Sequence, residues 1–352
     1  MLAASLALPI TAWTAPGGKR GKAARSSMPL VDDNAPDVVT YGMREDVALF
    51  AAAVAERRDL DPGWVRHALA QARYVPSVVR YIMPPAAGTA KNWAAYRARF
   101  VEPVRIRAGS AFWRANARWL DRAEEIYGVP PEVVVGVIGV ETIYGRQMGT
   151  FRVIDALATL AFDFPPGRKD RSEFFRDELE SWFVLCQSEG IDPLAWRGSY
   201  AGAFGMTQFM PSSFNRYAVD FDDDGHVDLH ASAADAIGSV ANYLAEFEWK
   251  RGLPARFDVK APVDASERAA LLAPDIVPTF TAAQMLAHGA VLGEDALASG
   301  SLLALVELQN GDAAPSYVAG TTNFYALTRY NWSSYYAMAV LSLGEAVRTD
   351  MR

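Results

Sequence analysis

An unbroken apolar run near the middle of the chain places the strongest constraint on the fold. Residues 133 to 140 read VVVGVIGV and carry no polar side chain. Pro131 and Glu132 precede the run, as is typical of a first helical turn, where proline fits and a carboxylate faces the positive end of the helix dipole. A helix that is apolar on every side is buried. We therefore predict a core helix, with a buried strand as the alternative because Val and Ile dominate.

Composition favours a globular protein and excludes several classes. Of the 352 residues, 51% are hydrophobic and 21% are charged, which is not the composition of a disordered or collagen-like chain. The net charge of −7, without a long basic block, argues against a nucleic-acid partner. The one cysteine, Cys186, excludes an intrachain disulfide and a cysteine-based metal cluster.

The first fifteen residues, MLAASLALPITAWTA, are almost wholly apolar. They match the core of an export signal in length and are too short to span a bilayer. No Lys or Arg precedes the run and no clean A-x-A site follows it, so we expect an export signal whose start is assigned too late, with an N-terminal tail as the alternative. No cysteine follows that could carry a lipid, and no other stretch predicts a transmembrane segment.

Helical patterns cover most of the chain up to residue 250. From about Arg44, apolar residues at helical spacing predict one helix, and Asp61 before Pro62 predicts the start of a second. Prolines at positions 76, 84 and 85 favour a loop. Further helices are expected over about 93–101 and 105–127, and another begins at Pro211.

Residues 251–320 have a different pattern. The stretches LLALVELQN and SYVAG predict two strands joined by a turn at Asn310 and Gly311. The chain then ends in a helix that contains SSYYAMAVLSLGEAV. The predicted fold class is mainly α, with a small antiparallel β insertion before the last helix.

Glu141 closes the apolar run and is the only acidic or basic residue between Glu132 and Arg146. A carboxylate near a helix C-terminus faces the negative end of the dipole, and burial disfavours its charged form as well. Both effects raise its pKa, as a general acid at neutral pH requires. A surface glutamate, or one paired with Arg146 or Arg152, is the alternative.

The segment RGSYAGAFGMTQFMPSSFNRY, residues 197–217, mixes glycines with aromatic residues. Glycines allow close approach of the backbone to a ligand, aromatic faces such as that of Tyr200 stack on sugar rings, and Gln208 can both donate and accept hydrogen bonds. A tightly packed corner between helices explains the same composition.

The segment DFDDDGHVDLHASAAD, residues 220–235, matches the first nine positions of an EF-hand calcium loop. Position 12, normally glutamate, is Ala231, and Asp235 lies four residues further on. A solvated acidic turn is the alternative. The candidate ligands for calcium are Asp220, Asp222, Asp224, the peptide oxygen of His226, Asp228 and Asp235.

Together these segments resemble the lytic murein transglycosylase B family. The motifs GVPPEVVVGVIGVETIYG, GSYAGAFGMTQFMPSS, DFDDDGHVDLHASAADAIGSVANYL and RYNWSSYYAMAVLSLGEAV occur in the family's order and cover most of residues 91–347. The resemblance implies a lysozyme-like helical core, a helical N-terminal region and a small β domain. It also implies cleavage of the β-1,4 bond between N-acetylmuramic acid and N-acetylglucosamine in peptidoglycan, without water, leaving a 1,6-anhydromuramyl product.

The resemblance assigns roles residue by residue. It makes Glu141 the single catalytic acid and then base, and it makes the 220–235 loop a calcium site, which we expect to be structural. Extra acidic residues, Asp223 and Asp228, leave the identity of the metal open. The residues that it implies for substrate binding are Ser199, Gln208, Tyr330, Asn331, Tyr335, Tyr336 and, on weaker spacing, Tyr96, and we add Tyr200 for its aromatic face.

The resemblance also suggests an organisation and a location. The expected segments are an export signal and linker (1–38), a helical N-terminal region (39–125), a lysozyme-like core (126–250), a β-containing domain (251–320) and a helix that completes the core (321–352). Some family members carry a lipid-bearing N-terminal cysteine, so its absence predicts a soluble periplasmic form. We expect glycan strands of peptidoglycan as the partner, no organic cofactor and a monomer, with cell-wall complex partners left open.

Three other functions fit parts of the sequence. A hydrolytic muramidase needs a water held near the reacting carbon, which a sequence does not reveal. A non-catalytic peptidoglycan-binding scaffold has no use for a buried acid at position 141. A calcium sensor normally pairs two loops, and one loop is present here.

Overall fold

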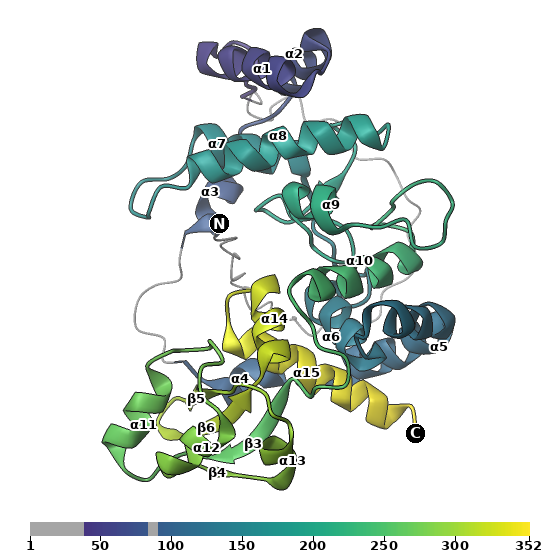
Figure 1. Ribbon diagram of the computed structural model, residues 1–352. Helices are drawn as coiled ribbons and strands as arrows, with labels where there is room; N and C mark the ends of the chain where they lie inside the picture. Colours follow the sequence, from purple (N-terminus) through teal and green to yellow (C-terminus); the bar gives the residue numbers. More distant parts are fainter. Residues whose placement is uncertain (1–38, 84–90) are drawn as a thin grey trace, which may run out of the picture.

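A computed structural model describes residues 39–83 and 91–352 of the chain. Within these ranges the chain is mainly helical, with one small antiparallel sheet and a two-stranded ribbon (Figure 1). The predicted fold class is therefore confirmed. The proposed export signal and linker, residues 1–38, and the prolines at 84 and 85 lie outside the described residues.

The N-terminal helices follow the predicted boundaries closely. Helix α1 spans Glu45–Arg58, and α2 spans Pro62–Ala70 with Asp61 as its N-cap, accepting a hydrogen bond of 2.6 Å from the Trp64 amide. The loop predicted around Pro76 is wrong, because α3 (Pro76–Ile82) is a helix. Pro76 occupies the first turn of α3, where its missing N–H costs no hydrogen bond, so this proline starts a helix instead of breaking one.

Helices α4 (Trp93–Ala98) and α5 (Pro103–Tyr127) follow. Helix α4 ends three residues before the predicted end, and α5 begins two residues before the predicted start. The Glu102 carboxylate accepts hydrogen bonds from the amides of Val104 and Arg105, which explains why α5 begins at Pro103.

The apolar run is helical, as predicted, and forms α6 (Pro131–Thr142), where the residues from Val133 to Val140 are all buried. It crosses the last helix, α15 (Ser334–Asp350), at glycines. A Cβ atom at Gly136 would lie 2.3 Å from the Val340 carbonyl oxygen, and one at Gly344 would lie 2.0 Å from that of Glu132. The backbones approach too closely for any side chain at these two positions.

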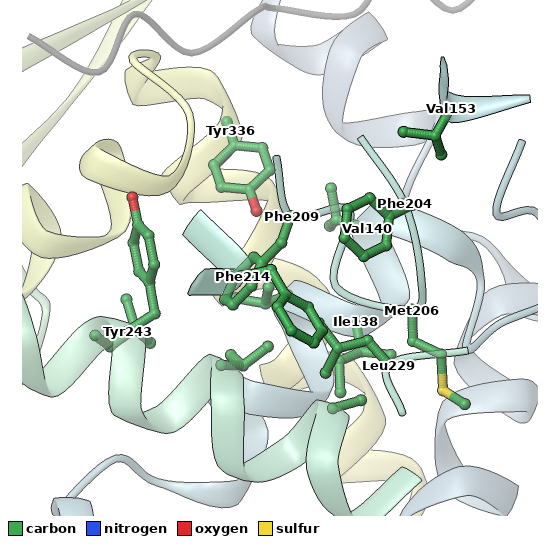
Figure 2. Packing of buried hydrophobic residues seen from close by; sticks show 14 of the residues in the cluster. Ile138, Val140, Val153, Phe204, Met206, Phe209, Phe214, Leu229, Tyr243 and Tyr336 are labelled. Carbon is green, nitrogen blue, oxygen red and sulfur yellow. The ribbon is translucent and has the colours of Figure 1, made fainter. Parts of the chain in front are cut away.

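The other elements of the main core surround this helix pair. The surrounding elements are α7 (Val153–Phe162), α8 (Ser172–Ser188), α9 (Pro211–Tyr217), α10 (Ala233–Glu246), α14 (Thr322–Tyr330) and the short ribbon of β1 (Phe151–Arg152) with β2 (Arg197–Gly198). Figure 2 shows residues from α6, from the 204–214 segment, from α10 and from α15 meeting in one apolar cluster.

The sheet has the strand order β4-β3-β6-β5 and is antiparallel throughout. The predicted strand pair is confirmed as β5 (Ala304–Asn310) and β6 (Ala313–Gly320), and Gly311 adopts φ +64° in the turn. The sheet is completed by β3 (Arg256–Lys260) and β4 (Val291–Leu292), and its helices are α11 (Ala265–Leu272), α12 (Ala282–Ala287) and α13 (Glu294–Ala298).

The sheet and its three helices have a hydrophobic cluster of their own, around Phe257, Leu271 and Met285, and lie at the opposite end of the molecule from α1 and α2 (Figure 1). The main cluster extends from Tyr41 to Val347, so the N-terminal helices share a core with the final helix. The exact segment boundaries stay predictions. Among the described helices, none combines the length and apolar character that a membrane span requires.

The glycine crossing makes a prediction about stability. Gly136→Ala should lower the free energy of unfolding by about 1–3 kcal/mol, because the new methyl group meets a backbone carbonyl that is unable to move aside. Urea denaturation measures the change, with Gly293→Ala as the matched control because its Cβ would have no neighbour within 4 Å. Equal stability of the two variants would contradict the close crossing.

Candidate active site

Glu141 lies at the C-terminal end of α6, half-buried, beside the first turn of α15. The Tyr336 hydroxyl donates a hydrogen bond of 2.6 Å to Glu141 Oε1. Burial raises the pKa of the carboxyl group from its ordinary value of 4.5 to about 7, and the bond from Tyr336 opposes part of that rise. At neutral pH the group can therefore both release and accept a proton.

The charged residues described around Glu141 do not pair with its carboxyl group, which can therefore exchange a proton. Arg152, one of the partners considered from the sequence, pairs instead with Asp155 at 2.7 Å, and Arg146 is exposed. Among the described residues no ion pair to Glu141 is formed. A cation in contact would hold the pKa of this carboxyl group low and remove the acid at pH 7.

The backbone turns sharply after Glu141, a feature that the sequence analysis missed. Ile143, Tyr144 and Gly145 have φ values of +52°, +57° and +82°, a conformation that β-branched and aromatic residues adopt at a cost. Thr142 stabilises the turn, because its Oγ1 donates to the Met206 carbonyl at 3.0 Å and accepts from the Gly145 amide at 3.0 Å. The Tyr144 ring stacks on Phe112 of α5 at 5.2 Å.

Three of the tyrosines predicted from the sequence surround Glu141. The rings of Tyr330 and Tyr336 stack at 6.1 Å, and the Tyr330 hydroxyl donates to the Thr207 carbonyl at 2.6 Å. Burial raises the pKa of Tyr96 to about 12, and the nearby Glu141 charge adds to this rise. Tyr335 packs edge-on against Tyr96 at 5.8 Å. The phenols therefore remain protonated and can donate hydrogen bonds.

Two polar atoms near these tyrosines lack partners. The Oδ1 atom of Asn331 and the Oγ1 atom of Thr207 are buried and make no hydrogen bond within the described part of the chain. A buried polar atom without a partner costs about 1–3 kcal/mol, and such atoms are rare in folded proteins. Asn331 follows Tyr330 directly in the chain and is partly exposed, whereas Thr207 is fully buried and its hydroxyl is closed off from a ligand.

Ser199, Tyr200 and Gln208 are used differently from the other predicted residues. The Gln208 Nε2 atom donates to the carbonyls of Met148 (3.1 Å) and Gly205 (3.0 Å), and the Ser199 Oγ atom accepts from the amides of Ala201 and Ala203. Tyr200 packs on Tyr81 at 5.8 Å. None of the three is hydrogen-bonded to Glu141 among the described residues. Gln208 instead ties its own segment to the turn that follows Glu141.

The acidic loop gathers three of its six predicted ligands. Carboxylate oxygens of Asp220, Asp222 and Asp235 lie within 4.8 Å of one another. Asp222 Oδ1 is buried and has no hydrogen-bond partner among the described residues, although carboxylate oxygens are strong acceptors. Three close carboxylates with an unsatisfied oxygen fit a hard cation such as Ca²⁺.

The other three predicted ligands, Asp224, His226 and Asp228, are not part of this cluster. Asp224 Oδ1 accepts from the His226 amide at 3.0 Å, while Asp228 Oδ1 accepts from the amides of His230 and Ala231. His226 is exposed. Asp235, in the first turn of α10, accepts from the amides of Phe221 and Asp228 and so holds both ends of the loop.

Comparison with known proteins gives consistent results. Residues 42–345 match the family described as the transglycosylase SLT domain. Membrane-bound lytic murein transglycosylase B of Escherichia coli (strain K12) is 39% identical over 306 residues, which are 85% of this chain and 81% of that protein.

Solved structures agree with this match. Lytic transglycosylase SltB1 of Pseudomonas aeruginosa superposes with a TM-score of 0.80 at 38% identity, covering 89% of this chain and all of that chain. The Escherichia coli lytic transglycosylase Slt35 in complex with calcium superposes with a TM-score of 0.76 at 36% identity, covering 92% of this chain and 99% of that one.

The raised pKa of Glu141 predicts a pH-dependent effect of its replacement. Because folding raises this pKa, the wild-type protein loses stability as the pH rises from about 4.5 through 7, whereas glutamine never ionises. Glu141→Gln should therefore be more stable than wild type by about 1–3 kcal/mol at pH 8 and equal to it near pH 4.5. Urea denaturation at the two pH values measures this. The exposed Glu294→Gln serves as the control, and an effect of Glu141→Gln that is independent of pH would contradict the assignment.

Proposed function

The chain belongs to the transglycosylase SLT domain family, and from this premise we propose how it acts as a lytic transglycosylase of peptidoglycan. We infer that it cleaves the β-1,4 bond between N-acetylmuramic acid and N-acetylglucosamine and leaves a 1,6-anhydromuramyl end. The observation that carries the proposal is the single carboxyl group with a pKa near 7, hydrogen-bonded by Tyr336 at the end of a lysozyme-like helical core.

The proposed reaction uses Glu141 twice. As an acid it gives its proton to the glycosidic oxygen, and the bond to the muramyl C1 breaks. The acetamido group of the same sugar meets the positive charge that develops at C1. Glu141, now a carboxylate stabilised by the Tyr336 hydroxyl, takes the proton from the muramyl C6 hydroxyl while that oxygen bonds to C1 and closes the anhydro ring. Glu141 ends protonated again, ready for the next cycle.

The electrostatics of the site support a mechanism with one carboxylate. Retaining hydrolases place a second carboxylate about 5–5.5 Å from the acid, where like charge would raise the pKa of the acid further. Burial and the Tyr336 hydrogen bond are the influences on Glu141 from the described residues, without a contribution from another carboxylate. We therefore assign nucleophilic attack to the substrate's own hydroxyl group.

The remaining polar groups are proposed to orient the sugar. Asn331 Oδ1 has no partner among the described residues, and Tyr96 and Tyr330 place protonated phenols close to Glu141. Gln208 and Ser199 contribute by holding the 199–210 segment against the turn after Glu141, with the Gln208 Oε1 atom available to substrate. A periplasmic location and a monomeric state both stay predictions.

We further propose that Ca²⁺ binds Asp220, Asp222 and Asp235 and acts structurally. The ion would neutralise carboxylates whose mutual repulsion otherwise opposes folding, and it would hold the loop against the start of α10. The Escherichia coli lytic transglycosylase Slt35 forms a complex with calcium. The cluster in this chain has the oxygen donors that a hard cation prefers.

A digest of purified peptidoglycan tests the reaction. Wild-type protein should release muropeptides one water lighter than hydrolysis products, as read by mass spectrometry, and Glu141→Gln should lower the rate by at least about 10³-fold while retaining binding to the polymer. Products of full hydrolytic mass would make the protein a muramidase. Binding without products from the wild-type protein would make it a scaffold, and a near-normal rate with Glu141→Gln would refute the assignment of the acid.

Calcium binding is tested by thermal unfolding with calcium or with a chelator. Calcium at 100 times its dissociation constant should stabilise wild-type protein by about 2.7 kcal/mol, seen as a rise in Tm. Asp222→Asn should lose most of this rise, while Asp312→Asn, an exposed aspartate in the β5–β6 turn, should retain it. A wild-type Tm that is insensitive to calcium would contradict the metal site.

A further inference from the structure

The turn that follows Glu141 brings the side chain of Tyr144 back against the helix that precedes it. Tyr144 adopts φ +57°, a left-handed conformation that an aromatic residue takes up at a cost. Its phenol reaches Gly139 of α6, where an added Cβ atom would lie 2.5 Å from the Tyr144 hydroxyl oxygen. The phenol thus occupies the space that a side chain at position 139 would fill.

A second glycine, on α5, lies on the other side of the phenol. A Cβ atom at Gly109 would lie 2.3 Å from the Tyr144 hydroxyl oxygen and 2.5 Å from a methyl group of Val347 in α15. The Tyr144 ring also stacks on Phe112 of α5. We call the space between Gly109, Gly139 and Phe112 the tyrosine socket. Three helices, α5, α6 and α15, therefore meet around one side chain (Figure 1).

The tyrosine socket holds the phenol by its shape. The Tyr144 hydroxyl is buried and makes no hydrogen bond to any described residue. Arg105, one turn before Gly109 on α5, instead donates to the Arg99 carbonyl at 2.6 Å. A strained backbone and a buried hydroxyl group without a partner both cost free energy. Stability alone therefore gives no reason for a tyrosine at this position, and strain of this kind is typical of functional sites.

Tyr144 links the two helices that carry the acid and its hydrogen-bond donor. Gly139 of the socket belongs to α6, which also carries Glu141. Val347, beside the socket, belongs to α15, which also carries Tyr336. A hydrogen bond between oxygen atoms is lost once they separate by more than about 3.5 Å. A shift of α6 by roughly 1 Å relative to α15 is therefore enough to break the bond of 2.6 Å between Tyr336 and Glu141.

We propose that Tyr144 is a positioning residue for the reaction, whose ring holds Glu141 within hydrogen-bond reach of Tyr336; this inference rests on the proposed function. Tyr144 acts through Glu141 and does not itself touch the reacting sugar. Without the ring, the end of α6 is free to move in its contact with α5, and the acid spends less time in the productive geometry. A misplacement of about 1 Å lowers an enzymatic rate by up to about 10²-fold.

A double-mutant cycle on the full-length protein tests this role, with soluble glycan strands as substrate. Tyr144→Leu should lower kcat by about 10- to 100-fold and leave KM within about twofold, because the substrate does not contact the socket. Tyr144→Phe retains the ring and should recover most of that loss. In a Tyr336→Phe protein, adding Tyr144→Leu should cost less than about threefold, because the bond that the ring maintains is already absent. Losses that multiply independently would overturn the inference.

A second variant and a crystal structure test the socket itself. Gly109→Ala keeps the tyrosine but places a methyl group against its hydroxyl, so kcat should fall by about tenfold. Adding Tyr144→Phe should restore most of the rate, because the hydroxyl oxygen is the atom nearest to the new methyl group. A crystal structure of Tyr144→Leu, or of Gly109→Ala if the first variant does not fold, should show Tyr336 and Glu141 more than about 3.5 Å apart.

A control variant separates positioning from a general loosening of the core. Phe183→Leu removes part of a buried ring of α8 that packs on Trp64, and it should leave kcat within about twofold. An equal loss of kcat in this control, or an intact bond between Tyr336 and Glu141 in the crystal structure of the socket variant, would overturn the role of Tyr144. If the wild-type protein forms anhydro products in that case, the proposed function stands. A wild-type protein without activity would refute the proposed function, and the crystal structure would then decide whether Tyr144 holds the pair together.

Discussion

The hydrogen bond from Tyr336 to Glu141 depends on how closely α6 and α15 cross. Glycines at 136 and 344 remove the side chains that would hold the two backbones apart, and each glycine faces a carbonyl oxygen of the other helix. Tyr336 and Glu141 are separated by 195 positions in the sequence, so their hydrogen bond of 2.6 Å can form only if this crossing is fixed. Tight packing in the core thus sets the geometry of a polar pair at its edge.

The same pair explains the intermediate pKa of the acid. Burial alone would favour the neutral carboxyl group, and a cation in contact would favour the carboxylate. The phenol is a neutral donor and provides partial stabilisation of the charge, which leaves the pKa near 7. The strained turn that follows Glu141 then leads the chain away from the helix axis, and Thr142 and Gln208 bind this turn to the 199–210 segment.

Local features of the fold could be predicted from the sequence because their causes are local. Asp61 before Pro62, Pro131 before Glu132, and the strands on either side of Gly311 each specify a cap, a first turn or a hairpin within a few residues. Pro76 shows the limit of this reasoning. A proline can either start a helix or interrupt one, and at Pro76 a helix starts.

The sequence could nominate the members of the candidate site but not their geometry. The position of Glu141 at the end of an apolar run and the alternation of aspartates in the 220–235 loop marked both as candidates, and the family resemblance assigned their roles. Which oxygens turn inward depends on tertiary contacts: Asp222 retains an unsatisfied oxygen, whereas Asp224 and Asp228 bind backbone amides. The internal hydrogen bonds of Gln208 and Ser199 likewise need the folded loop, because an amide or hydroxyl group in a glycine-rich segment has many possible partners.

The two hydrophobic clusters place the acid and the charged margin of the sheet in different surroundings. The main cluster surrounds the acid with protonated tyrosines and few charges, which maintains a high pKa and suits neutral sugars. The sheet has a separate cluster, so charged residues on its margin, such as Asp275 and Glu307, stand near the site without contributing to the pKa of Glu141. Had these carboxylates belonged to the main cluster, their field would have shifted the acid itself. The two-part fold therefore keeps the charges at the margin of the sheet apart from a carboxyl group whose pKa depends on isolation from charge.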